Sequence, residues 1–301
     1  MDTKVLVFLT LFGSALWGQN VETVFVGPQW KKGETRVIEM AVQTVRYDST
    51  GRPLAAGDRI FTLTPAQMTV LKAGVGGYTV RWRQGAAQIY FDTLPIPPNP
   101  AGDPMLETLN QPLDFVFKTD PEGKITALAN HKSLKSRLLS QMRKHARSEA
   151  QKKALAAMES RMKTEGGVRA MLATLPEIYF SGFVGEVYLQ DTVEFAASLN
   201  GVPAAGRIVV SGYEPDSGLV RVTTTILPDV LDERFIGWVR QKTGVEGSVS
   251  VETLNRYGKK LGLRDERTIV YDVYARRLRS VHLVRVGNQA REEIIMEDGG
   301  N

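Results

Sequence analysis

Residues 131–169 read HKSLKSRLLSQMRKHARSEAQKKALAAMESRMKTEGGVR, and this stretch, His131 to Arg169, is the long helical pattern in a chain that otherwise consists of short alternating segments. Eleven of its 39 residues are Lys or Arg and three are Glu, which gives a net charge of +8. The remaining 27 basic and 30 acidic residues give the rest of the chain a net charge of −3. The basic character of the protein is therefore local, and the segment separates two β-rich halves.

Two apolar stripes run along this segment, namely Leu134, Leu138 and Met142, and then Leu155, Met158 and Met162. The spacing of each stripe is that of one helical face, but one straight helix would turn the two stripes to opposite sides. We therefore expect a break near Ser148, where Ser148 and Gln151 have the spacing of a capping box. A short third helix is expected over Val168–Leu175, ended by Pro176, which lacks an amide donor. The helices are expected to form an excursion from the sheet.

Composition bounds the class of protein and its chemistry. The 301 residues are 43% hydrophobic and 24% charged, as in an ordinary globular protein of one large domain or two modest ones. The chain has no cysteine. Disulfides, thiol nucleophiles, thiolate metal sites and a lipid-modified cysteine are therefore all excluded.

The N-terminus predicts export. Lys4 precedes an apolar run, Val5 to Ala15, that has the length of a signal-peptide core and is too short to span a bilayer comfortably. Cleavage is expected after Ala15 or Gly18. The prediction is a periplasmic or secreted protein that is not a lipoprotein, and the alternative is a buried first strand.

Most of the remaining sequence predicts antiparallel strands and tight turns. Tyr78 to Arg83 alternates apolar and polar residues, and Asp120-Pro121-Glu122-Gly123 has the residues of a type I turn. Ile60 to Leu71 is expected to be a strand interrupted at Pro65. In the second half, Asp229 and Ser250 are expected to cap two short helices.

Strands in runs, with helices grouped between them, predict an α+β fold. We expect a large curved antiparallel β-sheet, half-barrel-like, of roughly eleven strands with a central basic helical insertion. The expected division is a signal peptide (1–18), an N-terminal β meander (19–129), the basic helical segment (130–176) and a C-terminal β half with two short helices (177–301).

The sequence offers no pattern of catalytic residues. His131, His145 and His282 lie on separate predicted elements, without the spacing of metal ligands, so neither a metal nor a cofactor is expected. The acidic pairs Asp265-Glu266 and Glu292-Glu293 lie on predicted strands, where neighbouring side chains point to opposite faces. A non-catalytic protein is therefore favoured, and a hydrolase with an unrecognised site is the third interpretation.

Two kinds of binding surface are predicted instead. Four methionines, whose side chains adapt to irregular ligands, could form an apolar wall for a lipid-like molecule: Met142, Met158, Met162 and Met171. The alternative is that they fill the core. Six basic residues could bind an anionic partner such as phospholipid head groups: Lys135, Arg143, Lys144, Arg147, Lys152 and Lys153. The alternative is a solvated helix face.

The order of these parts resembles a known class of protein. A Trp30-Lys31-Lys32-Gly33 entry, a hairpin at Asp120 to Ile125, charged helices and Leu175-Pro176 before a second β half are similar to uncharacterised secreted β-rich proteins of bacterial envelopes. The plan is more distantly similar to periplasmic lipoprotein-carrier half-barrels. The resemblance implies an envelope protein, but it carries over no site residue.

These observations lead to one functional hypothesis with an alternative. The protein is expected to be an exported envelope protein that binds a lipid-like or anionic ligand, or an anionic membrane surface, without catalysis. The alternative is a structural or protein-interaction scaffold with a protein partner in the envelope. Nucleic acid is not expected as a partner of an exported protein.

Overall fold

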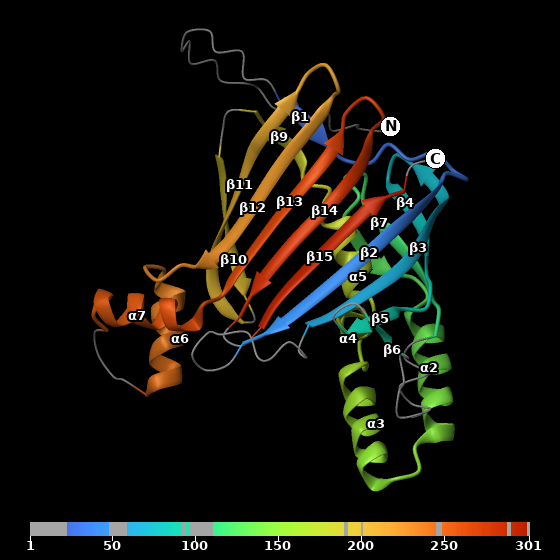
Figure 1. The fold of residues 1–301 in the computed structure, drawn as a ribbon, viewed down its shortest axis with the longest axis horizontal. Coiled ribbons are helices and arrows are strands. Elements are labelled where there is room, and N and C mark those ends of the chain that lie inside the picture. The colour runs from blue at the N-terminus through green and yellow to red at the C-terminus, as the bar shows by residue number, and fades with distance from the viewer. Residues whose placement is uncertain are drawn as a thin grey trace, which may run out of the picture.

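One large, open, curved sheet dominates the structure (Figure 1). The computed structural model describes residues 23–47, 59–91, 94–96, 111–189, 192–199, 201–244, 249–287 and 290–299. The predicted signal peptide therefore lies outside the described residues. Within these ranges every strand pairing is antiparallel, and the predicted α+β class with a curved antiparallel sheet is confirmed.

The large sheet has thirteen described strands, more than the roughly eleven expected. They are β2 (Thr35–Arg46), β3 (Arg59–Gly74), β4 (Gly77–Gln84), β5 (Gln88–Phe91), β6 (Leu94–Ile96), β7 (Leu113–Thr119), β8 (Ile125–Leu128), β10 (Thr192–Leu199), β11 (Val202–Glu214), β12 (Leu219–Pro228), β13 (Arg264–Asp272), β14 (Arg277–Val286) and β15 (Ala290–Asp298). A second, two-stranded sheet pairs β1 (Thr23–Val26) with β9 (Gly185–Tyr188). The described helices are α2 (His131–His145), α3 (Glu149–Arg161), α4 (Glu165–Leu172), α5 (Thr174–Phe180), α6 (Glu233–Thr243) and α7 (Val251–Leu261).

The two β halves form one sheet. Its order is β10-β11-β12-β13-β14-β15-β2-β3-β4-β7-β8, so the last strand of the chain lies beside β2. In that pairing Met40 is opposite Met296, and both side chains are buried. Pro65 does not interrupt β3, contrary to expectation. On one side of β3 the partner changes from β5 to β4, and Pro65 lies in the gap between these two pairings, where no amide donor is needed.

The predicted helix starts were correct in some places and wrong in others. Ser148 and Gln151 form the predicted capping box: the Gln151 amide donates to Ser148 Oγ at 3.1 Å, and the Ser148 amide donates to Gln151 Oε1 at 3.0 Å. The cap of α6 is Asp232 and not the predicted Asp229. The expected end at Pro176 was also wrong, because Pro176 lies in the first turn of α5, where its missing amide is not needed.

One face of the sheet, the core face, is covered by helices. Figure 1 shows α4 and α5 behind the sheet, and the buried side chains of α2, α4 and α5 belong to the same core cluster as those of the strands. Tyr179 and Phe180 of α5 contact Trp82 with ring centroids 5.3 and 5.9 Å apart. The helical segment is an insertion in the sequence, but it is not the expected excursion from the core. Figure 1 shows α2 and α3 extending together beyond the sheet, and α3 has Leu155 as its one buried residue.

A second, smaller cluster lies at one end of the sheet. Phe235 and Val239 of α6, Leu254 of α7 and Val202 of β11 are buried together. Figure 1 shows α6 and α7 at this end, away from α4 and α5. The core face therefore has two different ends. The covered end lies against α4 and α5, and the uncovered end is the one where α6 and α7 lie only to the side.

Candidate ligand cavity and basic hairpin

A cavity of about 520 Å3 lies at the uncovered end of the core face. This volume falls within the range of about 300 to 1,000 Å3 that is usual for small-molecule sites. Eleven residues line it: Thr44, Ser198, Leu199, Leu263, Arg264, Asp265, Arg285, Val286, Gly287, Ala290 and Glu292. They come from β2, β13, β14, β15 and the ends of β10 and α7, so the cavity depends on both halves of the chain.

The polar wall of the cavity is a row of cross-strand neighbours. Asp265 is opposite Arg285, Arg285 is opposite Glu292, and Glu292 is opposite Thr44. Arg285 lies between the two acids, with Nε 3.1 Å from Asp265 Oδ2 and Nη1 3.5 Å from Glu292 Oε2. Since strand neighbours share a face, the four side chains form one continuous strip.

The neighbouring row contains a second arginine. Arg267 lies two residues along β13 from Asp265, on the same face, and its Nη1 donates to the carbonyl of Ser181 at 2.9 Å. Its Nε is buried without a hydrogen-bond partner among the described residues. Burial lowers the pKa of Arg267, and the charge of Arg285 lowers it further. The guanidinium of Arg267, which does not itself line the cavity, is therefore close enough to that of Arg285 in the cavity wall to feel its charge.

The rest of the lining contains the polar Ser198 and the charged Arg264, together with an apolar wall of Leu199, Leu263, Val286 and Ala290. Leu199 is buried and Leu263 packs against the cluster of α6 and α7, so the cavity lies between the main core and the smaller cluster. Beyond it on the core face, Phe195 of the edge strand β10 is 37% exposed, and its ring lies over Gly206, where a Cβ would meet it at 2.2 Å. An apolar strip therefore continues from the cavity toward the sheet edge.

Sequence reasoning missed this site. It noted both acidic pairs and correctly placed the two members of each on opposite faces: Glu292 faces the cavity, while Glu293 accepts from His282 Nε2 at 2.7 Å on the other face. The sequence did not show that one member of each pair, Asp265 and Glu292, would meet across β14. The order and register of the strands were needed for that.

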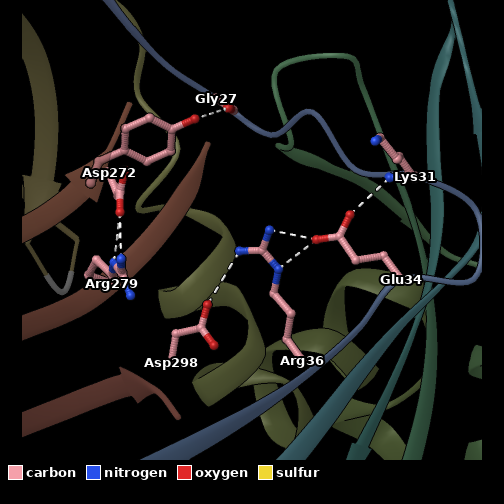
Figure 2. A network of polar contacts seen from close by, with 8 residues as sticks. Gly27, Lys31, Glu34, Arg36, Asp272, Arg279 and Asp298 are labelled. Atoms are coloured by element: carbon pink, nitrogen blue, oxygen red, sulfur yellow. Dashed lines mark hydrogen bonds and ion pairs between the residues drawn. The ribbon is translucent and has the colours of Figure 1, made fainter. Parts of the chain in front are cut away.

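A smaller cavity of about 260 Å3 lies at the covered end, beside a buried network of charges. Figure 2 shows Arg36 between Glu34 and Asp298, at 2.6 and 3.4 Å. The phenol of Tyr179 is buried next to Arg36; burial raises its pKa, although the charge of Arg36 opposes this. Because the charged groups satisfy one another, the network is best understood as a clamp between β2 and the end of β15.

Further hydrogen bonds stabilise the same end of the sheet, and Figure 2 shows the pairing of Asp272 with Arg279. The Tyr271 hydroxyl donates to the carbonyl of Gly27 at 2.6 Å, and burial raises the pKa of Tyr271 to about 12. Asp272 accepts from the Ala275 amide at 2.7 Å and from Arg279 Nη2 at 2.6 Å. Burial alone would raise the pKa of Asp272, but these hydrogen bonds and the charge of Arg279 outweigh burial and lower it.

The predicted methionine wall lies in the protein's own core. Met142 and Met162 are fully buried, and Met158 and Met171 are half-buried against the same cluster. The cavity at the uncovered end is lined by other residues. The methionines therefore fill space between α2, α3, α4 and the sheet, as in the alternative considered above.

The predicted basic residues lie on a helical hairpin, α2 and α3 with their flanking residues 131–163, here called the basic hairpin. Two of the six are paired within it: Arg143 with Glu159, and Lys152 with Glu149 at 2.8 Å. Lys144, Arg147 and Lys153 are exposed and Lys135 is half-buried, and none of these four makes an ion pair with a described residue. Four more basic residues of the hairpin are exposed and have no ion pair within the described ranges: Lys132, Arg137, Arg161 and Lys163.

The other sequence features bring no chemistry to the cavity. His131 Nδ1 lies 2.9 Å from the carbonyl of Leu128, and His145 lies near the end of the basic hairpin's first helix. In the part of the chain that the structure describes, no group of three or more acidic or histidine side chains is arranged to hold a metal ion. Among the same residues, no helix has both the length and the apolar character needed to cross a membrane.

Comparison with known proteins adds little. No family model matches the chain, and no curated protein matches it. A solved structure, DynF from the dynemicin biosynthesis pathway of Micromonospora chersina, is similar over 96% of this chain and 93% of that chain, with 8% sequence identity and a TM-score of 0.19. A similarity this weak supports no conclusion about fold or function.

Proposed function

We propose that this protein is an exported, non-catalytic binding protein of the bacterial envelope that holds a lipid-like molecule in the cavity at the uncovered end of its sheet. The observation that carries this proposal is the division of the cavity into a charged row and an apolar wall. A molecule with a polar head and an apolar body matches both parts, whereas a wholly polar or wholly apolar ligand matches only one.

The charged row suits an acidic head group. Arg285 donates a hydrogen bond to Asp265 at 3.1 Å and forms a longer ion pair with Glu292 at 3.5 Å, and a stronger acceptor could displace the longer contact. The buried Nε of Arg267 lacks a partner among the described residues, and burial of an unpaired donor costs about 1 to 3 kcal/mol. An anionic head group near the two guanidinium groups would recover part of that cost.

The apolar wall suits the body of the ligand. Leu199 and Leu263 lead toward the cluster of α6 and α7, and the exposed ring of Phe195 continues the strip along the core face. Covering such surface contributes about 25 cal/mol for each Å2 removed from water. The ligand would then lie along the strands with its head at Arg285.

The test is binding of cis-parinaric acid, a fluorescent long-chain fatty acid, together with mass spectrometry of lipid extracted from the purified protein. Ala290→Trp places a large ring in the cavity and is expected to abolish the fluorescence increase. Ala205→Trp adds the same ring at an exposed position of β11 and is the matched control. No extracted lipid and no binding by the unaltered protein would show that the proposal is wrong, as would equal binding by both variants.

Export is the part of the proposal that rests on sequence alone. The Val5 to Ala15 run supports it. Intact-mass measurement of protein taken from its native cells is expected to give an N-terminus between Ala15 and Asn20. Soluble cytoplasmic protein that retains Met1 would contradict export without affecting the cavity.

A scaffold remains the second candidate because of one edge of the sheet. Within the described residues β10 pairs only with β11, and Val193 and Phe195 on it are exposed. Exposed edge strands readily pair with another chain. Val193→Lys is expected to remove a co-purifying protein partner in the scaffold case, and to leave binding of cis-parinaric acid nearly unchanged if the cavity is the site.

A further inference from the structure

The basic hairpin packs on the core through one face of α2, and its far part extends beyond the sheet as an arm. Figure 1 shows α3 extending past the end of the sheet at which β2 ends and β13 begins, the end that also holds the cavity. On α3 only Leu155 is buried, so most of its surface faces solvent. The capping box at Ser148 fixes the start of α3 directly after the turn between the two helices. The turn therefore has a defined conformation.

Charge is concentrated on this arm to an unusual degree. Residues 131–163 contain ten Lys or Arg and two Glu, a net charge of +8 in a chain whose total is +5. Both acids are already used in pairs with Arg143 and Lys152. The other eight basic residues make no ion pair within the described part of the chain, and seven of them are exposed. These eight basic residues do not stabilise the fold through their charges, because exposed like charges on neighbouring helical turns repel one another.

The distribution of the basic side chains over the surface of the hairpin indicates the kind of partner. Arg137 and Lys144 lie seven residues apart on the solvent side of α2, and Lys153 lies on α3 opposite the buried Leu155. These residues form an extended positive surface, and the cavity that Arg137 lines at the base of α2 has a volume of only about 10 Å3. Such a surface fits a broad anionic plane better than a single small anion, which needs converging donors.

We infer that the basic hairpin is an arm that attaches the protein reversibly to an anionic lipid surface. Attachment through the basic hairpin would bring the cavity end of the sheet toward the membrane. The meaning of this orientation rests on the proposed function of the cavity. The attachment itself does not depend on that function. The exposed side chains of α3 beside its charges are mostly alanines, including Ala154, Ala156 and Ala157, so binding is electrostatic and shallow.

The test is co-flotation with vesicles of phosphatidylcholine alone and of phosphatidylcholine with phosphatidylglycerol. The unaltered protein is expected to float only with the anionic vesicles and to be released as salt rises, because exposed charges are screened over roughly 8 Å at physiological ionic strength. Each charge near the surface strengthens binding roughly fivefold, so the triple variant Arg137→Gln, Lys144→Gln, Lys153→Gln is expected to bind roughly 100-fold more weakly.

Two matched variants separate the arm from net charge and from side-chain shape. Lys32→Gln, Lys72→Gln, Lys118→Gln removes three exposed charges from the other end of the sheet and is expected to keep binding within a few-fold. Arg137→Lys, Lys144→Arg, Lys153→Arg keeps every charge and is expected to bind like the unaltered protein. Thermal unfolding checks that each variant is folded.

Several results would overturn the inference. These are no flotation with anionic vesicles at low salt, equal flotation with both kinds of vesicle, equal loss in the arm variant and the Lys32 variant, and tight binding of a single-stranded oligonucleotide in place of vesicles. Binding of cis-parinaric acid is measured on the same variants. Absence of this binding in the unaltered protein, while that protein floats with anionic vesicles, would contradict the cavity and leave the arm in place.

Discussion

The two ends of the core face differ in how their polar groups are satisfied. At the covered end, the Arg36 side chain is 10% exposed and lies between Asp298, which is 3% exposed, and Glu34, which is 25% exposed. At the uncovered end, Arg285 also lies between two carboxylates, but its side chain is 38% exposed and a cavity lies beside it. The same arrangement of an arginine between two acids is thus buried at one end and open at the other. Burial makes the first a structural clamp and leaves the second available to a ligand.

The largest expected difference between the ends concerns packing. Trp82→Ala is expected to lower the free energy of unfolding by roughly 3 to 5 kcal/mol, because the fully buried indole contacts Tyr179 and Phe180 and leaves a cavity. Phe195→Ala at the uncovered end is expected to cost less than about 1 kcal/mol, because its ring already faces solvent. Urea unfolding of the two variants measures both values. Equal losses would show that the uncovered end is packed as tightly as the covered one.

The clamp at the covered end provides the next prediction. Arg36→Met is expected to destabilise the fold by roughly 3 kcal/mol, because it removes a cation from beside the shielded carboxylates of Glu34 and Asp298. Adding Asp298→Asn to this variant removes one of the remaining charges and is expected to restore part of the loss. The measurement is again the free energy of unfolding. A double variant that is less stable by the sum of the two single losses would show that these residues do not act as a pair.

The sequence predicted features that depend on residues close together in the chain. It did not predict features that depend on residues far apart in the chain. The capping box at Ser148 and the turn at Gly123 need only residues three or four apart, and both were predicted correctly. The helix α5, which contains Pro176 in its first turn, was missed, because proline is suited both to the end of one helix and to the first turn of the next.

The site could not be predicted for a different reason. The row from Asp265 to Thr44 exists only because β15 pairs with β2, which brings together residues more than 200 positions apart. Alternation along a strand tells which residues share a face, but it does not tell which strands are neighbours. The charges of the basic hairpin were visible in the sequence, whereas the internal pairing of Arg143 and Lys152 and the availability of Arg137 required the structure.

The covered end should also respond to acid. The pKa of Asp272 is lower in the folded protein than in the unfolded chain, so its contribution to stability is present above the ordinary aspartate pKa of about 3.9 and is lost as pH falls through the folded value. We expect a loss of roughly 1 to 2 kcal/mol over that range, from the hydrogen bonds of Ala275 and Arg279. Asp272→Asn should reduce this part of the pH dependence below about pH 4, as measured by thermal unfolding against pH. An unchanged acid profile in this variant would assign the acid sensitivity to other carboxylates.

The smallest expected effect on stability belongs to the uncovered end, and it is the one that distinguishes a ligand site from a clamp. Arg285→Ala removes an arginine that, like Arg36, lies between two acids, but its partners are 21% and 37% exposed and water can replace it. We expect the free energy of unfolding to change by less than about 1 kcal/mol, because ion pairs that remain in contact with water contribute little.

Binding of cis-parinaric acid should nevertheless weaken roughly tenfold, because a hydrogen bond from a charged donor to the head group is lost. Arg221→Ala is the matched control, since Arg221 is exposed on the other face of the sheet and forms no ion pair within the described residues. A large loss of stability with unchanged binding in Arg285→Ala would mean that the uncovered end is a second clamp, and that the difference between the two ends lies only in their exposure.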